Sequence, residues 1–383
     1  MKNDSSRRNF LAAGLALPAA GLASTTSYTP PAPDPPQAEA PSRKLSYRVL
    51  GKTGLKLTTV GYGCMITSDA SVITRAVDMG INYFDTSRNY QNGQNERMVG
   101  AALGAKRKDI ILSSKVDAQD TAGALKELET SLKELNTDHL DIWHLHGKDA
   151  PERISDALLE AEQTAKQQGK IRFTAVSTHQ LPRVADKIIE AKLDVVTAAY
   201  NFTMDPAWAP AIEKLSKAGV GVIAMKVMAG GTRGRNPRPQ MQRPNAMASA
   251  LKWVLKNPGI TTTIPSMTDN DQLAQNFAVM AGEFSDADAK ILAARLEEIR
   301  PYYCRMCGQC DGKCPQGLHV ASVLRYVMYA ESYGQFSLGR EHFQALPAEQ
   351  QQVRCTQCPT CAIQCPNGVR VAERLIRAQE LFA

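Results

Sequence analysis

The chain has 383 residues, a hydrophobic fraction of 43% and a charged fraction of 22%, which is the composition of an ordinary globular protein. Its net charge of +7 comes from Lys and Arg side chains scattered along the sequence, so nothing indicates a nucleic-acid-binding surface. Beyond residue 23 no apolar run reaches the ~18 residues that a membrane span needs. The length allows one large domain and a smaller one.

Residues 1–23 have the pattern of an export signal. Arg7 and Arg8 precede a short, weakly apolar run, which is typical of a twin-arginine signal. The small residues at the end of the run, Gly21 and Ala23, fit a cleavable peptide. We therefore expect the twin-arginine export machinery as a partner and the periplasm as the destination. This route carries proteins already folded around a cofactor, so the signal itself predicts one.

Residues 24–43 are expected to form a disordered linker, because they are rich in proline and contain almost no large apolar side chains. After this linker, β-rich runs alternate with helical patterns up to residue 300. The expected strands are 58–65, 82–87, 109–116, 139–146, 171–178, 194–201, 220–227 and 260–267. The expected helices include 121–135, 153–168, 206–217 and 245–256.

Eight such units predict parallel strands joined by helical crossovers, because most of the strands are apolar on both faces. Their number and size match a (β/α)8 TIM barrel over residues 44–300. A doubly wound open sheet is the alternative, but no GxGxxG follows the first strand. Residues 45–57 look like a hairpin that caps the floor of the barrel. Residues 301–383, where cysteines punctuate two helical patterns, form a second domain.

Reactive side chains of such barrels lie at the C-terminal ends of the strands. At these places the sequence has Asp85, Lys115 and His146, and Tyr90 follows in the loop after Asp85. A phenol with a pKa near 10 is a poor acid at neutral pH, so we expect the Lys115 ammonium to lower the pKa of Tyr90. Asp85 would hold Lys115 charged, and His146 would hydrogen-bond the substrate oxygen. Such a set can give a proton to a carbonyl oxygen as hydride arrives, or remove it in reverse.

Each of these side chains alone has an ordinary structural interpretation, such as a loop tyrosine or a core histidine. Their occurrence on three successive units favours the catalytic interpretation. His144 lies two residues before His146, on the same face of the strand, and we expect it to be structural.

Three segments resemble the aldo-keto reductase family. GINYFDTSRNYQNGQNERMVG (80–100) is similar to the family signature, and DHLDIWHLHG (138–147) to the segment that ends in the catalytic histidine. GKIRFTAVST (169–178) is similar to the fifth-strand segment that contacts nicotinamide. The resemblance covers about residues 46–285, and all four catalytic positions match. It implies a small-molecule carbonyl or alcohol substrate, and NADH or NADPH bound without a Rossmann fold.

By position, the resemblance also implies the residues that lie near the dinucleotide. They are Gly63, Cys64, Ser177, Thr178, Lys226, Ser266, Gln275 and Asn276. Some positions depart from the family pattern. Thr178 stands where Asn is usual, Thr197 where Gln usually meets the carboxamide, and Met225 where an aromatic side chain usually stacks on nicotinamide.

The preference between NAD and NADP stays open. Ser266 and Gln272 replace the Lys and Arg that typically hold the 2′-phosphate, and losing bidentate Arg contacts should weaken a preference for NADP. Arg233, Arg235 and Arg238 either hold the pyrophosphate or belong to a solvated basic loop.

Eight of the nine cysteines lie in CRMCGQCDGKCP (304–315) and CTQCPTCAIQCP (355–366). Each segment reads C-x2-C-x2-C-x3-C-P, the bacterial ferredoxin run for a [4Fe–4S] cluster, whose fourth cysteine usually ligates the other cluster. The expected ligand sets are Cys304, Cys307, Cys310 and Cys365 for one cluster, and Cys355, Cys358, Cys361 and Cys314 for the other. Zinc and disulfides are the alternatives, but zinc sites need no triplet followed by C-P. We therefore expect an α-helical ferredoxin-like domain with two [4Fe–4S] clusters.

The sequence leaves three functions open. The first is an oxidoreductase that is exported with a tightly bound nicotinamide cofactor and acts on a sugar or another carbonyl or alcohol. The second is a nicotinamide-independent dehydrogenase that passes electrons to a respiratory partner through the clusters. The third is an exported electron-transfer module without enzymatic activity, which the set of Tyr, Lys, Asp and His side chains argues against. In the first case the clusters either transfer electrons or are structural.

Overall fold

The computed structural model describes residues 44–204, 206–230 and 245–383. The expected signal (1–23) and linker (24–43) lie outside the described residues, as do Arg233, Arg235 and Arg238. Within the described ranges, no helix combines the length and the apolar character needed to cross a membrane.

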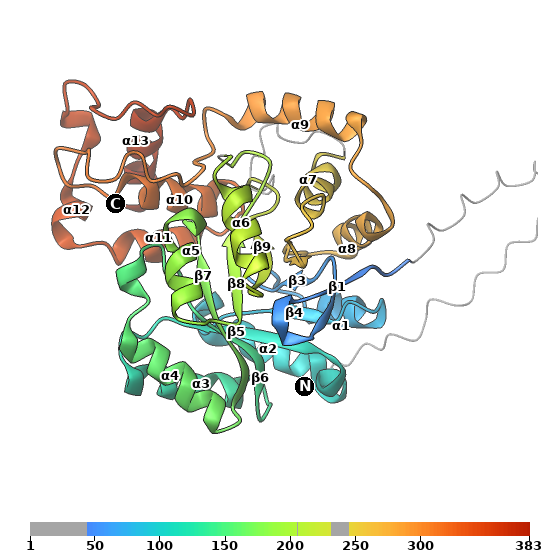
Figure 1. Ribbon diagram of the computed structural model, residues 1–383. Coiled ribbons are helices and arrows are strands. Elements are labelled where there is room, and N and C mark those ends of the chain that lie inside the picture. Colours follow the sequence, from blue (N-terminus) through green and yellow to red (C-terminus); the bar gives the residue numbers. More distant parts are fainter. Residues whose placement is uncertain (1–43, 205, 231–244) are drawn as a thin grey trace, which may run out of the picture. The chain divides into compact units, whose positions relative to one another are not determined.

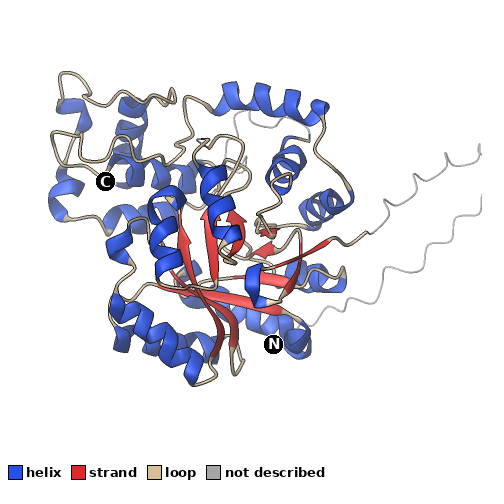
Figure 2. Ribbon diagram, viewed as in Figure 1, coloured by secondary structure: helices blue, strands red, loops and turns tan. Residues whose placement is uncertain are grey.

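A parallel sheet of eight strands forms the centre of the described chain (Figure 1, Figure 2). In order around the sheet the strands are β3 (Tyr62–Gly63), β4 (Tyr83–Asp85), β5 (Ile111–Val116), β6 (Leu140–Leu145), β7 (Ile171–Thr178), β8 (Val195–Ala199), β9 (Gly221–Met225) and β10 (Thr262–Thr263). A parallel bridge between Val60 and Thr263 joins the first edge to the last. The predicted barrel is therefore confirmed, and its strands follow one another in chain order.

Helices between the strands, and two more after the last strand, cover the outside of this sheet, which explains why the strands are buried on both faces. They are α1 (Ala70–Asp78), α2 (Gln94–Leu103), α3 (Thr121–Glu134), α4 (Asp156–Gln167), α5 (Leu181–Glu190), α6 (Trp208–Lys217), α7 (Ala246–Leu255), α8 (Asn270–Ala278) and α9 (Asp286–Ile299). Several begin at side-chain caps that the sequence supplies. Asp120 accepts the backbone N–H of Gly123, and Ser285 and Asp288 form a capping box.

A hairpin of β1 (Tyr47–Val49) and β2 (Lys56–Thr58) closes the barrel at the N-terminal ends of its strands. Its Leu50 and Leu57 are fully buried among inward-facing residues of the sheet. Gly51 has φ +46°, and a Cβ there would lie 2.4 Å from the backbone of Gly219, just before β9. This close approach requires glycine, and it places the hairpin at the floor, as predicted.

The C-terminal region has its own hydrophobic core, to which α10 (Val320–Glu331), α11 (Phe336–Gln344) and α13 (Val371–Phe382) contribute. The short helix α12 (Ala348–Gln352) follows α11. These are the orange to red helices in Figure 1. Residues such as Val327 on α10 and Phe382 on α13 are buried in this core. The two cysteine runs lie mostly in turns between the helices. The predicted helical character of this region is confirmed.

The C-terminal region contacts the loops that follow the barrel strands. Gln180, after β7, donates to the carbonyl oxygen of Met306. Asn201, after β8, donates from Nδ2 to the Tyr303 hydroxyl at 3.1 Å. The Met306 side chain packs into the barrel core. These contacts attach the cysteine-rich region to the end of the barrel where the strands terminate.

Candidate functional site

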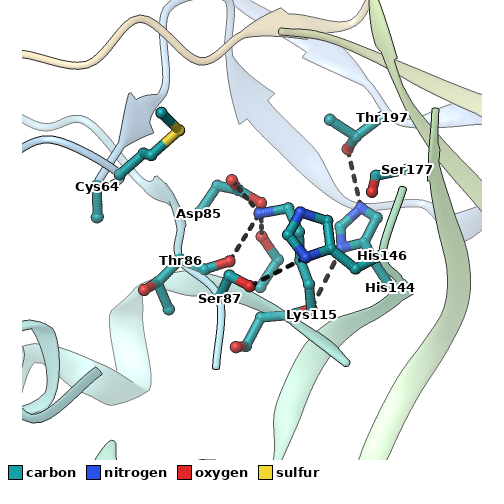
Figure 3. A network of polar contacts seen from close by, with 12 residues as sticks. Cys64, Asp85, Thr86, Ser87, Lys115, His144, His146, Ser177 and Thr197 are labelled. Atoms are coloured by element: carbon teal, nitrogen blue, oxygen red, sulfur yellow. Dashed lines mark hydrogen bonds and ion pairs between the residues drawn. The ribbon is translucent and has the colours of Figure 1, made fainter. Parts of the chain in front are cut away.

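A buried ion pair lies at the C-terminal ends of β4 and β5. Lys115 Nζ lies 2.5 Å from Asp85 Oδ2 and 2.7 Å from the carbonyl oxygen of Thr86 (Figure 3). Ser113 donates to the other carboxylate oxygen of Asp85 at 2.7 Å. Side chains of Lys115 and Asp85 are only 1% and 3% exposed. Because both charges are paired and hydrogen-bonded, the ammonium is held at a fixed place inside the barrel.

Tyr90 lies beside this pair, in the loop after β4. The Lys115 ammonium is 5.1 Å from the centroid of its ring, so it lies over the aromatic face. Burial raises the pKa of Tyr90 well above 10, and the carboxylate of Asp85 raises it further. The expected lowering of this pKa is therefore wrong for this structure. The physical reason is that desolvation disfavours the phenolate, while the ammonium is already paired with Asp85.

His146 follows β6 and meets Tyr90 edge to face, with 6.1 Å between ring centroids and 79° between ring planes. Its Nδ1 lies 3.0 Å from Asp117 Oδ2 and 3.5 Å from the Ser87 hydroxyl oxygen (Figure 3 shows the contact with Ser87). The structure thus brings the side chains of all four predicted catalytic residues to one end of the barrel.

His144 lies deeper in the barrel and is fully buried. Its Nε2 is 2.8 Å from the Thr197 hydroxyl oxygen, and its Nδ1 is 3.4 Å from the carbonyl oxygen of Ser114 (Figure 3). Burial lowers the pKa of His144 to about 3, so the ring is neutral. Both ring nitrogens are engaged within the barrel, as expected of a structural residue.

A cavity of about 290 Å³ opens above Asp85, Tyr90 and Lys115. Five of the predicted dinucleotide contacts also line it, namely Gly63, Lys226, Ser266, Gln275 and Asn276. Four methionines make much of its wall apolar, namely Met65, Met225, Met228 and Met247. A Cβ at Gly63 would lie 2.5 Å from the carbonyl oxygen of Ile264, so packing against the strand end explains this glycine without any ligand.

The other three predicted dinucleotide contacts are not among the residues that line this cavity. Cys64 is fully buried, and burial strongly raises the pKa of its thiol. Ser177 accepts the backbone N–H of Gly147 at 2.9 Å. Thr178 donates to Asp149 at 3.1 Å and accepts the N–H of Gln180 at 2.9 Å. These hydroxyls hold loops at the barrel rim.

The sequence analysis missed a wall of the cavity that α10 and the residues after it supply. Ser332 and Tyr333 line the cavity. Lys226 Nζ lies 5.0 Å from the ring centroid of Tyr329 and 5.3 Å from that of Tyr333. Burial, followed by the charges of Arg325 and Lys115, lowers the pKa of Lys226 to about 7. The sequence did contain a signal for this wall, because Tyr329 and Tyr333 are four residues apart in an apolar segment with a helical pattern.

The eight tail cysteines form two groups. Burial raises the pKa of Cys304 to about 12, and the thiols of Cys310, Cys307 and Cys365 raise it further. Burial likewise raises the pKa of Cys355, and the thiols of Cys358, Cys314 and Cys361 raise it further. In each group the fourth thiol comes from the other run. All eight are free thiols, so the disulfide alternative does not describe this structure.

The surroundings of these thiols fit iron–sulfur clusters. A cavity of about 430 Å³ is lined by the whole second group, Cys314, Cys355, Cys358 and Cys361. Backbone and amide N–H groups also point at sulfur, from Met306 to Cys304 at 3.3 Å and from Gln379 to Cys355 at 3.4 Å. Such donors are typical around cluster thiolates. No group of three His, Cys, Asp or Glu side chains among the described residues has the arrangement of a single-ion site.

Comparison with known proteins agrees with both parts of the chain. Residues 67–247 match the model of the aldo/keto reductase family, and residues 303–369 match that of the 4Fe-4S dicluster domain. An uncharacterized oxidoreductase of Bacillus subtilis, YqkF, is 26% identical over 66% of this chain and 96% of its own length. The L-galactose dehydrogenase of Arabidopsis thaliana is 27% identical over 62% of this chain and 88% of its own length.

Among solved structures, the holo form of aldo-keto reductase AKR11C1 from Bacillus halodurans is similar, with a TM-score of 0.57 and 26% identity. The similarity covers 66% of this chain and 96% of that one. The protein is therefore an oxidoreductase that joins an aldo/keto reductase family domain to a C-terminal 4Fe-4S dicluster domain.

Proposed function

We propose that the barrel interconverts a carbonyl and an alcohol of a small molecule, a sugar among the candidates, with a nicotinamide cofactor and with Tyr90 as the proton donor. When bound, the nicotinamide supplies the hydride for reduction and accepts it in oxidation. The cavity supports this proposal because it joins Tyr90 and Lys115 to polar side chains at the other predicted cofactor positions, Ser266, Gln275 and Asn276. Met225 lines the same cavity and offers a nicotinamide ring a flat apolar contact.

The proton balance follows from the buried side chains. In reduction the O–H bond of Tyr90 breaks and a new O–H bond forms on the carbonyl oxygen, as the carbonyl carbon takes up the hydride. The Lys115 ammonium, 5.1 Å from the ring centroid of Tyr90, offsets part of the cost of the phenolate left behind. Asp85 keeps that ammonium in place. In oxidation the same proton returns from the alcohol to Tyr90.

The single observation that carries this proposal is the buried Asp85–Lys115 pair beneath Tyr90, with His146 at the edge of the ring. The test is Tyr90→Phe, assayed on a panel of aldehydes, ketones and aldoses with NADH and NADPH. We expect carbonyl reduction to fall by about 10²–10⁴-fold because the proton donor is lost. Cluster absorbance should not change, which shows that the variant is folded. Full activity in Tyr90→Phe would refute the role of Tyr90.

The residues at the predicted 2′-phosphate position also influence the choice between NAD and NADP, which stays open. Gln272 donates to the carboxylate of Asp269. A carboxylate beside the predicted 2′-phosphate position disfavours NADP, in the same direction as the missing Arg.

Electron transfer through the clusters is the second candidate role, and one observation favours it. Tyr303 precedes Cys304, one of the proposed ligands of the first cluster, and its ring lies behind the cavity wall. A Cβ at Gly230, which lines the cavity, would be 3.5 Å from that ring. The tyrosine next to a proposed cluster ligand therefore packs against a residue that lines the cavity. Two clusters that each take one electron match the two electrons of an alcohol oxidation.

We further propose export by the twin-arginine route to the periplasm. This proposal is supported by Arg7, Arg8 and the apolar run that follows them. Export of folded protein also fits a chain that holds clusters, since these are inserted before the protein leaves the cytoplasm.

A further inference from the structure

The proposed catalytic histidine has a carboxylate partner that the sequence analysis did not single out. His146 and Asp117 are the first residues after β6 and β5, and these strands pair in parallel with Leu145 opposite Val116. The backbone N–H of His146 donates to the carbonyl oxygen of Val116 at 2.9 Å, which continues the pairing. The sheet itself thus fixes the 3.0 Å contact between His146 Nδ1 and Asp117 Oδ2.

Asp117 is held in place by further contacts. Its backbone N–H donates to Glu127 at 3.0 Å, and its carbonyl oxygen accepts from Gln119 at 2.6 Å. Burial alone would raise the pKa of Asp117, but the hydrogen bond and charge of His146 and the charge of the buried Lys148 lower it below its usual value. Asp117 is therefore a carboxylate at neutral pH, and a carboxylate can only accept hydrogen bonds.

This acceptor determines which nitrogen of His146 carries the proton. If Nδ1–H donates to Asp117, the neutral ring has a bare Nε2 and no donor left for a substrate oxygen. The same ring donates from Nε2 to a carbonyl oxygen only after it gains a second proton. The neighbouring carboxylate stabilises that charged form.

We propose that Asp117 is a positioning residue, which fixes the Nδ1–H tautomer of His146 and stabilises its charged form. The charged ring then donates a hydrogen bond from Nε2 to the substrate oxygen in both directions, which leaves the single O–H proton of the alcohol for Tyr90. His146 makes hydrogen bonds only, so the proton balance through Tyr90 does not change. This inference rests on the proposed function, because it assigns His146 to the substrate oxygen.

Other titratable or charged groups interact with His146 or Asp117 and belong to the same electrostatic environment. They are Tyr90 from the loop after β4, Glu127 from α3, His144 and Lys148 from β6 and its loop, and His342 from α11. Each of them is unchanged in a variant that alters Asp117 alone, so a change in activity reports the loss of that carboxylate.

The test compares Asp117→Asn with the full-length parent, using 4-nitrobenzaldehyde for reduction and 4-nitrobenzyl alcohol for oxidation. We expect reduction to fall by about 10–100-fold, the range found when the carboxylate that orients a metal-bound histidine is removed. The loss should appear in kcat rather than in KM, because Asp117 orients the ring that hydrogen-bonds the reacting oxygen. Unchanged kcat and KM would overturn the proposal.

The chain offers a matched control. His139 Nδ1 lies 2.6 Å from Asp138, an exposed pair at the other end of β6, so Asp138→Asn removes the same kind of carboxylate away from the site. Its kcat and KM should equal those of the parent. Tyr90→Phe in the same assay separates the two proposals. If it stays active, the proposed function fails, and if it is inactive while Asp117→Asn is normal, only the role of Asp117 fails.

A measurement on the unaltered protein covers the case in which Asp117→Asn does not fold. With ¹⁵N-labelled histidine, the ring nitrogens of His146 can be assigned by comparison with His146→Gln. In the neutral ring we expect the proton on Nδ1. A ring protonated on Nε2 would contradict the proposal without reference to any activity.

Discussion

Asp85 and Lys115 show how a few residues decide the chemistry of this site. Neither charge is exposed to water, and each is compensated mainly by the other. The sequence predicted both positions because they end neighbouring strands, but it gave the wrong direction for the pKa of Tyr90. Whether desolvation or a nearby cation prevails depends on where the ammonium lies relative to the hydroxyl, and a sequence contains no such distance.

At this scale we predict that Lys115→Met and Asp85→Asn each destabilise the barrel strongly. Each single change leaves an uncompensated buried group, with a cost of about 3–5 kcal/mol for a buried pair. The double variant removes both charges, so its midpoint of thermal unfolding should lie above that expected from adding the two single losses. Anaerobic thermal unfolding of the four proteins measures this. Additive losses would mean that the two groups do not stabilise each other.

Helix α10 and the turn after it show what an element from the second domain adds to the barrel. Ser332 and Tyr333 line the cavity, and the ring of Tyr333 stacks on that of Tyr329, with Lys226 Nζ close to both rings. The sequence predicted a helix here but not its partner, because an amphipathic pattern identifies the buried face and not the surface that covers it. The contact of Lys226 with the two tyrosines depends on how the C-terminal domain packs against the barrel.

At the element scale we predict that Tyr333→Ala changes substrate binding while the clusters remain intact. Removing the ring opens the cavity and removes a cation–π contact of about 0.5–2 kcal/mol with Lys226. KM for the preferred carbonyl should rise several-fold, with cluster absorbance unchanged. Tyr333→Phe keeps the ring and should behave like the parent. Equal KM values in all three proteins would show that α10 does not shape the site.

For the whole molecule, the central question is whether the two domains exchange electrons. The first cysteine group lies next to the barrel, since Cys304 also packs against the barrel core and Tyr303 lies behind the cavity. Hydrogen bonds from Gln180 and Asn201 attach the C-terminal domain to the end of the barrel that carries the proposed catalytic residues. This arrangement brings a proposed cluster ligand close to the cavity without requiring any domain motion.

If the clusters accept electrons from the substrate, anaerobic incubation with an alcohol that the protein oxidises should produce the EPR signal of reduced [4Fe–4S]. Cys365→Ser, which removes a ligand of the first group, should abolish that signal. Cys358→Ser, which alters the second group, should keep the signal of the first cluster. Turnover without any cluster signal in the parent protein would instead support structural clusters.

By itself the sequence determined the barrel, the floor hairpin, the helical cysteine-rich domain and the positions that carry the four polar side chains. These follow from local periodicity and spacing, which are encoded over a few residues. Only the tertiary structure decided that Asp117 meets His146, that the turn after α10 lines the cavity, and that burial raises the pKa of Tyr90. Such features depend on distances between segments far apart in the chain and on the exclusion of water, which exist only once the chain has packed.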